Sequence, residues 1–216
     1  DRTIGAYRLL LFRQRNLATL PLYASDKGGF IAVMGSLLFD GVPAPDCLPA
    51  LLDNIKEGTS KWDKLSGTHN IIAIRDETLY IQADALGASR IYVNEREDIW
   101  SNSFLAVCEI AQPKHFDKQA CFEYMVAGSV FGNKSLVKGI DSLPTNSILS
   151  ITDEGVQTHQ RPSPVKNDAL DKFATLDAIA DFHIQQLERV FEPLARHCAD
   201  RIRLSFSGGF DSRLML

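Results

Sequence analysis

Ile71–Ala83 reads IIAIRDETLYIQA, two apolar runs that meet at the acidic pair Asp76-Glu77. Runs of this length that are rich in Ile, Leu and Tyr are typical of β-strands, and a two-residue connection is the length of a tight hairpin loop. The stretch therefore predicts an antiparallel hairpin. A second hairpin is expected further along the chain, because Ser147–Ile151 and Gly155–Gln160 repeat the arrangement.

Outward from these hairpins, short apolar runs continue at close intervals. Further strands are expected over 7–12, 28–39, 90–93 and 99–103, and helices over 46–55, 104–110 and 118–127. Gly35 lies inside the long run 28–39, and a glycine within a strand often marks a bulge or the close approach of another backbone. Closely spaced strands with few helices between them predict a layered, largely antiparallel α+β domain that ends near residue 160.

The pattern changes after residue 160. Arg161-Pro162-Ser163-Pro164 is typical of a linker, because two prolines stand in four mostly polar residues. From 173 to 194, apolar residues recur every three or four positions and predict a long amphipathic helix, kinked or restarted at Pro193. His183 falls on its apolar side and is interpreted as a core or interface histidine. We expect one domain over 1–160 and the start of a second over 161–216.

Composition excludes several classes of protein. The 216 residues are 45% hydrophobic and 23% charged, with a formal net charge of −4. This balance argues against a nucleic-acid binder, because phosphate neutralisation requires an excess of Lys and Arg. No apolar run approaches the roughly 20 residues of a membrane span, and the first residues do not resemble a signal peptide. The widely spaced cysteines predict reduced thiols in a cytoplasmic protein; they are Cys47, Cys108, Cys121 and Cys198.

The last part of the chain carries the motif with the clearest chemistry. An apolar run over 201–206 leads into Ser207-Gly208-Gly209-Phe210-Asp211-Ser212 and then into residues 213–216, an order that predicts a strand, a glycine-rich turn and the start of a helix. Glycines let the backbone approach a phosphate, and the free N–H groups at a helix start attract anions. The lysine and spacing of the GxxxxGK[ST] phosphate loop are absent.

The candidate nucleotide-binding residues lie in this turn and the strand before it. They are Ser205, Ser207, Gly208, Gly209, Asp211 and Ser212. The hydroxyls of Ser207 and Ser212 would donate to phosphate oxygens, and the carboxylate of Asp211 would be a hard oxygen ligand for Mg²⁺. ATP and Mg²⁺ are therefore the expected cofactors, and Asp211 is the expected metal ligand. A second interpretation is that the glycines only make a strand-to-helix turn capped by Ser or Asp.

This turn and several upstream segments resemble known sequences. Ser207–Ser212 resembles the SGGxDS pyrophosphate-binding loop of the PP-loop ATP pyrophosphatases. Upstream, four segments resemble, in the same order, stretches of the amino-terminal half of the asparagine synthetases. They are Gly67–Asp76 (GxFAFAxxD in the family), Ala83–Tyr92 (ARDxxGxxPLY), Trp100–Ser103 (FASE) and Phe122–Pro144 (YL…TLFxGIxxLPPG).

The resemblance implies a fold and an activity. It implies a layered antiparallel-sheet domain of the amino-terminal-nucleophile hydrolase type, followed by the first helix and strand of an α/β PP-loop domain. In the family, the first domain splits glutamine and releases ammonia. The second uses ATP and Mg²⁺ to adenylate a carboxylate, which an amine then attacks. A loop that binds the leaving pyrophosphate assists attack at the α-phosphorus.

The chain departs from the family at the glutaminase site. Glutamine hydrolysis there requires a cysteine as the first residue, whose own α-amino group is the base. This chain begins with Asp1, and its first cysteine is Cys47. Where the family has VNGE, Val33-Met34-Gly35-Ser36 keeps the glycine but neither the side-chain amide nor the carboxylate. We therefore expect structural cysteines and no catalytic residue, a pattern that resembles the branch of beta-lactam synthetases and lasso-peptide cyclases.

These observations predict part of an ATP-dependent, amide-forming ligase that acts on a small-molecule or peptide carboxylate, with no nucleic-acid or membrane partner. Because Leu216 ends the sequence within the helix after the loop, a continuation of the synthetase domain or a second chain is expected to complete it. Two alternatives stay open. One is a glutamine-hydrolysing asparagine synthetase whose terminal cysteine precedes Asp1. The other is a non-catalytic relic or interaction module.

Overall fold

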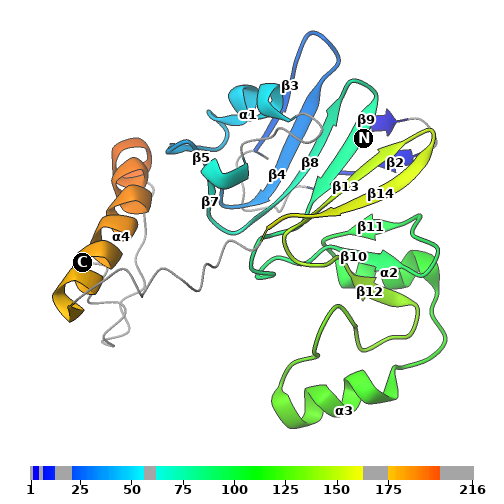
Figure 1. The fold of residues 1–216 in the computed structure, drawn as a ribbon. Coiled ribbons are helices and arrows are strands. Elements are labelled where there is room, and N and C mark those ends of the chain that lie inside the picture. The colour runs from blue at the N-terminus through cyan, green and yellow to red at the C-terminus, as the bar shows by residue number, and fades with distance from the viewer. Residues whose placement is uncertain (1, 5–6, 13–20, 56–61, 163–174, 200–216) are drawn as a thin grey trace.

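The structure, a computed structural model, describes residues 2–4, 7–12, 21–55, 62–162 and 175–199. Within these ranges the chain combines α-helices with four β-sheets, and the paired strands all run antiparallel (Figure 1). The expectation of a mixed α and β architecture with antiparallel sheets is confirmed. The domain boundary near residue 160 stays a prediction.

The largest sheet has six strands in the order β14-β13-β9-β8-β4-β3. In that order they are Gly155–Gln160, Ser147–Thr152, Thr78–Gln82, His69–Arg75, Phe30–Gly35 and Leu22–Ala24. Both predicted hairpins are present, β8 with β9 and β13 with β14. Asp76 and Glu77 connect β8 to β9 with φ of +49° and +62°, the left-handed values that both residues of a type I′ turn require.

The two faces of this sheet carry different clusters of buried side chains, because successive residues of a strand point to opposite faces. On β8, Ile71 and Ala73 belong to the first cluster, which includes buried leucines of α1 (Leu48–Asn54). The same cluster extends into the small sheet β6-β5-β7. That sheet consists of Val42–Pro43, Leu38–Phe39 and Leu65–Ser66, the last preceded by the short 3-10 helix η1, Trp62–Lys64.

The opposite face of the sheet forms the second cluster. Ile72 and Ile74 of β8 pack there with Ile91, Val93 and Trp100, which belong to or adjoin the sheet β11-β10-β12. The strands of that sheet are Trp100–Ser101, Tyr92–Asn94 and Ile140–Ser142, and the two-stranded sheet consists of β1, Arg2–Ile4, and β2, Tyr7–Leu9. The six-stranded sheet is thus covered on both faces.

The run 28–39 was expected to form one strand and instead forms two, so that prediction is wrong. β4 ends at Gly35, and β5 begins at Leu38. Gly35 has a φ of +101°, which turns the chain out of the ladder, and the N–H of Ser36 then donates to the carbonyl of Thr68 at 2.9 Å. The glycine inside the run marks a close backbone approach, as its position had indicated.

Three of the helices follow the predicted ranges closely. α2 is Phe104–Ala111, α3 is Lys118–Ala127 and α4 is Leu176–Cys198. Each begins after a side-chain cap; Asp117, for example, accepts from the backbone N–H of Gln119 and Ala120. α4 contacts β6 and continues through Pro193 as one helix, so the restart expected there is not observed. His183 is exposed on α4, so the interpretation as a core histidine is wrong, and a place in an interface stays a prediction.

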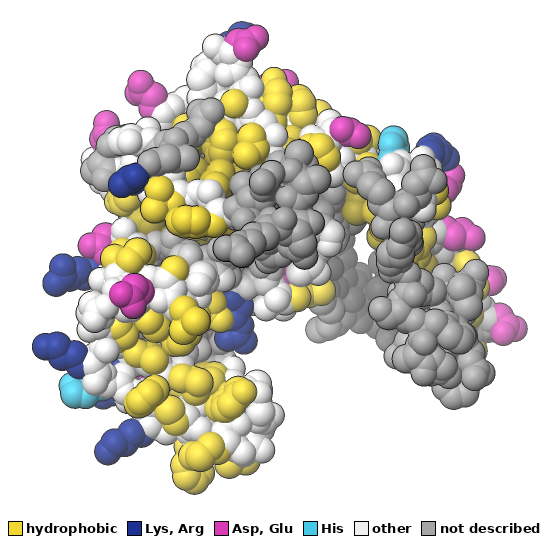
Figure 2. All heavy atoms as spheres, turned by 180° about the vertical axis from the view of Figure 1, so that it is seen from behind, with side chains coloured by type: hydrophobic (Ala, Val, Ile, Leu, Met, Phe, Trp, Pro, Cys, Tyr) yellow, Lys and Arg dark blue, Asp and Glu magenta, His cyan; other side chains and the backbone are white. Residues whose placement is uncertain are grey.

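Hydrophobic side chains gather over the lower part of the molecule, where α3 lies (Figure 2). The large exposed apolar residues of this region are Phe116, Phe122, Tyr124, Met125, Val126 and Phe131. Among the helices in the described ranges, none has both the length and the hydropathy of a membrane span.

Candidate functional site

The predicted phosphate-binding turn lies outside the described residues. This applies to Ser205, Ser207, Gly208, Gly209, Asp211 and Ser212, and to the strand expected over 201–206. The amphipathic helix expected upstream of them is described and corresponds to α4. The nucleotide site, and Asp211 as its metal ligand, therefore stay predictions.

The end of β4 is the place where the resemblance implies an oxyanion hole. A β-carbon on Gly35 would lie 2.2 Å from the carbonyl oxygen of Thr68, and one on Gly67 would lie 2.3 Å from the carbonyl oxygen of Ser36. Real β-carbons do not approach an oxygen so closely, so both positions require glycine for packing alone. The glycine shared with the family thus has a structural role in this chain.

The next feature of this region is the buried side chain of Asp84, which accepts hydrogen bonds from backbone N–H groups. Its carboxylate accepts from the backbone N–H groups of His69 at 3.2 Å, Ala88 at 2.7 Å and Ser89 at 3.4 Å. The side chain of Asn70 accepts from the N–H of Asp84 at 2.9 Å and donates to the hydroxyl of Ser89 at 2.6 Å. Asp84 is only 2% exposed, and its oxygens already accept these hydrogen bonds. Its carboxylate is therefore suited to stabilising the fold rather than to binding a substrate.

His69 lies at the start of β8, next to Asp84, and is 3% exposed. Burial is the main cause that lowers the pKa of its imidazole, and the charge of Arg161 acts in the same direction. The charge of Asp84 and the carbonyl of Gly67 oppose this shift and are outweighed. His69 is therefore a neutral imidazole at neutral pH, enclosed in protein.

Arg161 directly follows β14 and lies at the same end of the sheet as His69. Its backbone N–H donates to the carbonyl of Asn146, and its guanidinium lies over the ring of Trp62 at 5.6 Å. Burial lowers the pKa of Arg161 as well. Buried polar atoms here, including Gln82 Oε1 and Arg161 Nε, have no hydrogen-bond partner among the described residues. Sequence reasoning missed this cluster; the only signal was polar residues at the ends of apolar strands.

All four cysteines lie in the described ranges, and none of them forms a disulfide. Cys47 is 2% exposed, and burial raises its pKa to about 11. Burial also raises the pKa of Cys108, which is half-buried on α2. Because the thiolate is the nucleophilic form, Cys47 is poorly suited to catalysis at neutral pH. The structural role of Cys47 stays a prediction, which its burial supports.

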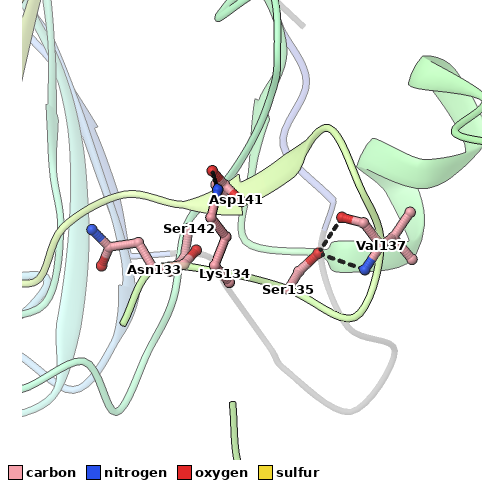
Figure 3. A network of polar contacts seen from close by, with 6 residues as sticks. All are labelled: Asn133, Lys134, Ser135, Val137, Asp141 and Ser142. Carbon is pink, nitrogen blue, oxygen red and sulfur yellow. Dashed lines mark hydrogen bonds and ion pairs between the residues drawn. The ribbon is translucent and has the colours of Figure 1, made fainter. Parts of the chain in front are cut away.

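The segment between α3 and β12, which resembles part of the asparagine synthetase sequence, is held by local polar contacts (Figure 3). Lys134 Nζ and Asp141 Oδ2 form an ion pair at 2.8 Å. The hydroxyl of Ser135 donates to the carbonyl of Val137 at 3.0 Å and accepts from its N–H at 3.1 Å. The hydroxyl of Ser142 donates to the carbonyl of Asn133 at 3.2 Å. These contacts give the segment a fixed shape.

Within the described ranges, no group of three or more His, Cys, Asp or Glu side chains lies close enough to hold a metal ion. A cavity of about 630 Å³ lies on the second face of the six-stranded sheet and is lined mainly by apolar side chains.

Comparison with known proteins gives little further guidance. No family model matches the chain, and no curated protein matches it. Among solved structures it is similar to the glutamine phosphoribosylpyrophosphate amidotransferase from B. subtilis complexed with ADP and GMP, and to another described as the allosteric regulatory enzyme of purine biosynthesis. Each is 13% identical with a TM-score of 0.37, and the match covers 64% of this chain and 30% of the other. A TM-score this low does not establish a common fold.

Proposed function

We propose that this chain is part of an asparagine synthetase-like, ATP-dependent ligase that forms an amide from a small-molecule or peptide carboxylate. The observation that carries the proposal is the sequence Ser207–Ser212 between an apolar run and a helix start, downstream of segments that resemble an amidotransferase domain in order. Hydroxyls, glycine backbone and one carboxylate are a donor set that suits a nucleotide phosphate with Mg²⁺.

Each residue of the turn has a separate task in this proposal. Ser207 and Ser212 donate hydroxyl hydrogen bonds to phosphate oxygens. Gly208 and Gly209 let the backbone N–H groups approach the same oxygens without a side-chain clash. Asp211 holds Mg²⁺, and the bound ATP supplies the activating group and the leaving pyrophosphate. By holding the pyrophosphate oxygens, these residues stabilise the charge that develops on the leaving group.

We propose further that the amino-terminal part is an amidotransferase-like scaffold that does not hydrolyse glutamine. Three observations support this. The buried thiol of Cys47, with a pKa of about 11, is a poor nucleophile, and Gly35 is occupied in a backbone contact with Thr68. Met34 and Ser36, which flank Gly35, supply neither an amide nor a carboxylate.

Exchange of labelled pyrophosphate into ATP, measured with the full gene product and a panel of carboxylates, tests the ligase. We expect exchange with at least one carboxylate, and a loss of a hundred-fold or more in Asp211→Ala. Asp181→Ala, on the exposed surface of α4, is the matched control and should retain wild-type exchange. Absence of exchange with every carboxylate, or equal ATP–Mg²⁺ binding by wild type and Asp211→Ala, would favour the non-catalytic relic. Ammonia release from glutamine would overturn the scaffold assignment.

A further inference from the structure

One face of α3 presents large apolar side chains to solvent. Phe122, Met125 and Val126 are exposed, and their spacing of three and four residues places them together on this face of the helix. Ala120, the one buried residue of α3, lies on the opposite face. The helix therefore packs on the rest of the chain with a small residue and turns its large apolar residues outward.

Two phenylalanines extend this apolar face beyond the helix. The backbone N–H of Phe131 donates to the carboxylate of Glu123 at 3.0 Å, which holds Phe131 beside α3. Phe116 directly precedes Asp117, the cap of the helix. Figure 2 shows hydrophobic side chains gathered over the part of the molecule where α3 lies. The α3 surface is defined here as Phe116, Phe122, Met125, Val126 and Phe131, whose side chains are between 63% and 77% exposed.

The area of the α3 surface suits one side of a dimer interface. At about 150–200 Å² for a whole side chain of this size, the exposed fractions leave roughly 500–700 Å² of apolar area in water. The largest apolar patch of a monomeric protein is typically about 300–600 Å². A standard interface covers about 800 Å² on each subunit, and in homodimers about 65% of that area is apolar.

The charges of α3 favour a second, antiparallel copy of the same helix. Lys118 stands in the first turn, which has no acidic residue, and the last turn has no basic residue. A cation is unfavourable at the start of a helix and favourable at its end. In an antiparallel pair, each Lys118 lies beside the last turn of the other helix. Asp117 and Glu123 need no cation from a partner, because they already accept from the N–H groups of Gln119 and Phe131.

We propose that two copies of this chain associate through the α3 surface, with the two helices antiparallel about a two-fold axis. An axis through the middle of the apolar stripe places Phe122 of one copy opposite Val126 of the other and brings Met125 of both copies near the axis. The same operation places Lys118 just past the end of the other helix. Two-fold dimers that use the same surface on both subunits are the commonest oligomers. The inference rests on residues 116–131 and does not depend on the phosphate turn.

Sedimentation velocity of the full chain over a range of concentrations measures the association. We expect a species of twice the monomer mass that dissociates on dilution. Phe122→Glu should raise the dissociation constant at least about thirty-fold, because it places a charge in the centre of the buried stripe. Met125→Glu repeats the test if Phe122→Glu does not fold, which circular dichroism shows. Leu176→Glu is the matched control, because Leu176 is an exposed apolar residue on a different helix, α4, and should associate like the wild type.

The orientation of the two helices is tested by Lys118→Glu. A carboxylate suits the first turn of a helix, so this variant should not destabilise α3 within each copy. It should nevertheless weaken the association about five-fold, because it places an anion beside the last turn of the other helix. Lys27→Glu, in the exposed turn between β3 and β4, makes the same change of net charge and should associate like the wild type.

A wild-type chain that sediments as a monomer at every concentration overturns the inference, and a different part of the protein or another partner then covers the α3 surface. A dimer that Phe122→Glu and Met125→Glu leave intact also overturns it, because the contact then lies elsewhere. An affinity that Lys118→Glu lowers no more than Lys27→Glu does overturns the antiparallel arrangement. These outcomes are independent of pyrophosphate exchange, so failure of the ligase proposal would leave them unaffected.

Discussion

Gly35 and Thr68 are in backbone contact: a β-carbon on Gly35 would lie 2.2 Å from the carbonyl oxygen of Thr68. The contact is repeated one residue away, where a β-carbon on Gly67 would lie 2.3 Å from the carbonyl oxygen of Ser36. The segment after β4 and the segment before β8 therefore pass each other without an intervening side chain. This contact lies where β4 ends and β8 begins.

Gly35→Ala should destabilise the protein by about 2–4 kcal/mol, because alanine disfavours a φ of +101° and its methyl group would overlap the Thr68 carbonyl. Gly128→Ala is the matched control. Gly128 ends α3 with a φ of +71°, but a β-carbon there would meet nothing within 4 Å, so we expect a cost of about 1 kcal/mol. Urea unfolding of the full chain measures both. Equal costs would show that backbone conformation alone, and not the contact, requires glycine.

Asp84→Asn should cost about 2 kcal/mol of unfolding free energy. The two carboxylate oxygens of Asp84 accept from the N–H groups of His69, Ala88 and Ser89. The substitution replaces one of these oxygens with an NH₂ group, a donor that would then face backbone N–H donors. Asp76→Asn is the control, because Asp76 is exposed and asparagine tolerates its left-handed turn conformation. The control should change stability by less than about 0.5 kcal/mol. Urea unfolding at pH 7 compares the two, and similar small effects would contradict a structural role for Asp84.

The stability of the fold should depend on pH through His69. Burial lowers its pKa in the folded state below 6.5, so the unfolded chain binds the proton first as the pH falls. This contribution to stability is complete above about pH 6.5, and is lost as the pH falls from there toward the folded-state pKa. The slope reaches at most about 1.4 kcal/mol per pH unit.

Urea unfolding of wild type and His69→Gln between pH 5 and 7.5 measures this dependence. The difference between the two free energies should shrink as the pH falls, because glutamine does not titrate. His159→Gln, with its exposed side chain on β14, should leave the wild-type slope unchanged. Parallel curves for wild type and His69→Gln would contradict the assignment of a buried neutral imidazole.

Local sequence patterns predicted those elements that are stabilised by interactions between residues close together in the sequence. The β8–β9 hairpin was predicted because its two-residue turn acts within a few residues, and α3 was predicted over 118–127, the range that it occupies. The break after Gly35 was not predicted, because it depends on Thr68, which is distant in the sequence.

The residues of the candidate site also differ in whether local sequence patterns can predict them. The phosphate turn is proposed from a contiguous motif, Ser207–Ser212, which lies outside the described residues, and it stays a prediction. The charge of Arg161 affects His69 only because the order of strands in the sheet brings the two residues close together. The cavity beside Trp100 likewise depends on strands and a helix from distant parts of the chain. Neither the environment of His69 nor this cavity leaves a recognisable pattern within a short stretch of sequence.

The reactivity of Cys47 tests its assignment as a buried structural thiol. With a pKa of about 11, against 9.0 for an ordinary thiol, Cys47 has about a hundred-fold less thiolate at pH 8, and burial restricts access further. Labelling by iodoacetamide at pH 8, followed by peptide mass spectrometry, should modify Cys47 at least a hundred-fold more slowly in the native chain than in the chain unfolded by urea. Unfolding removes the burial that raises the pKa and restricts access. If Cys47 reacted equally fast in the native and the unfolded chain, its thiol would be accessible and ionisable, which contradicts a buried structural role.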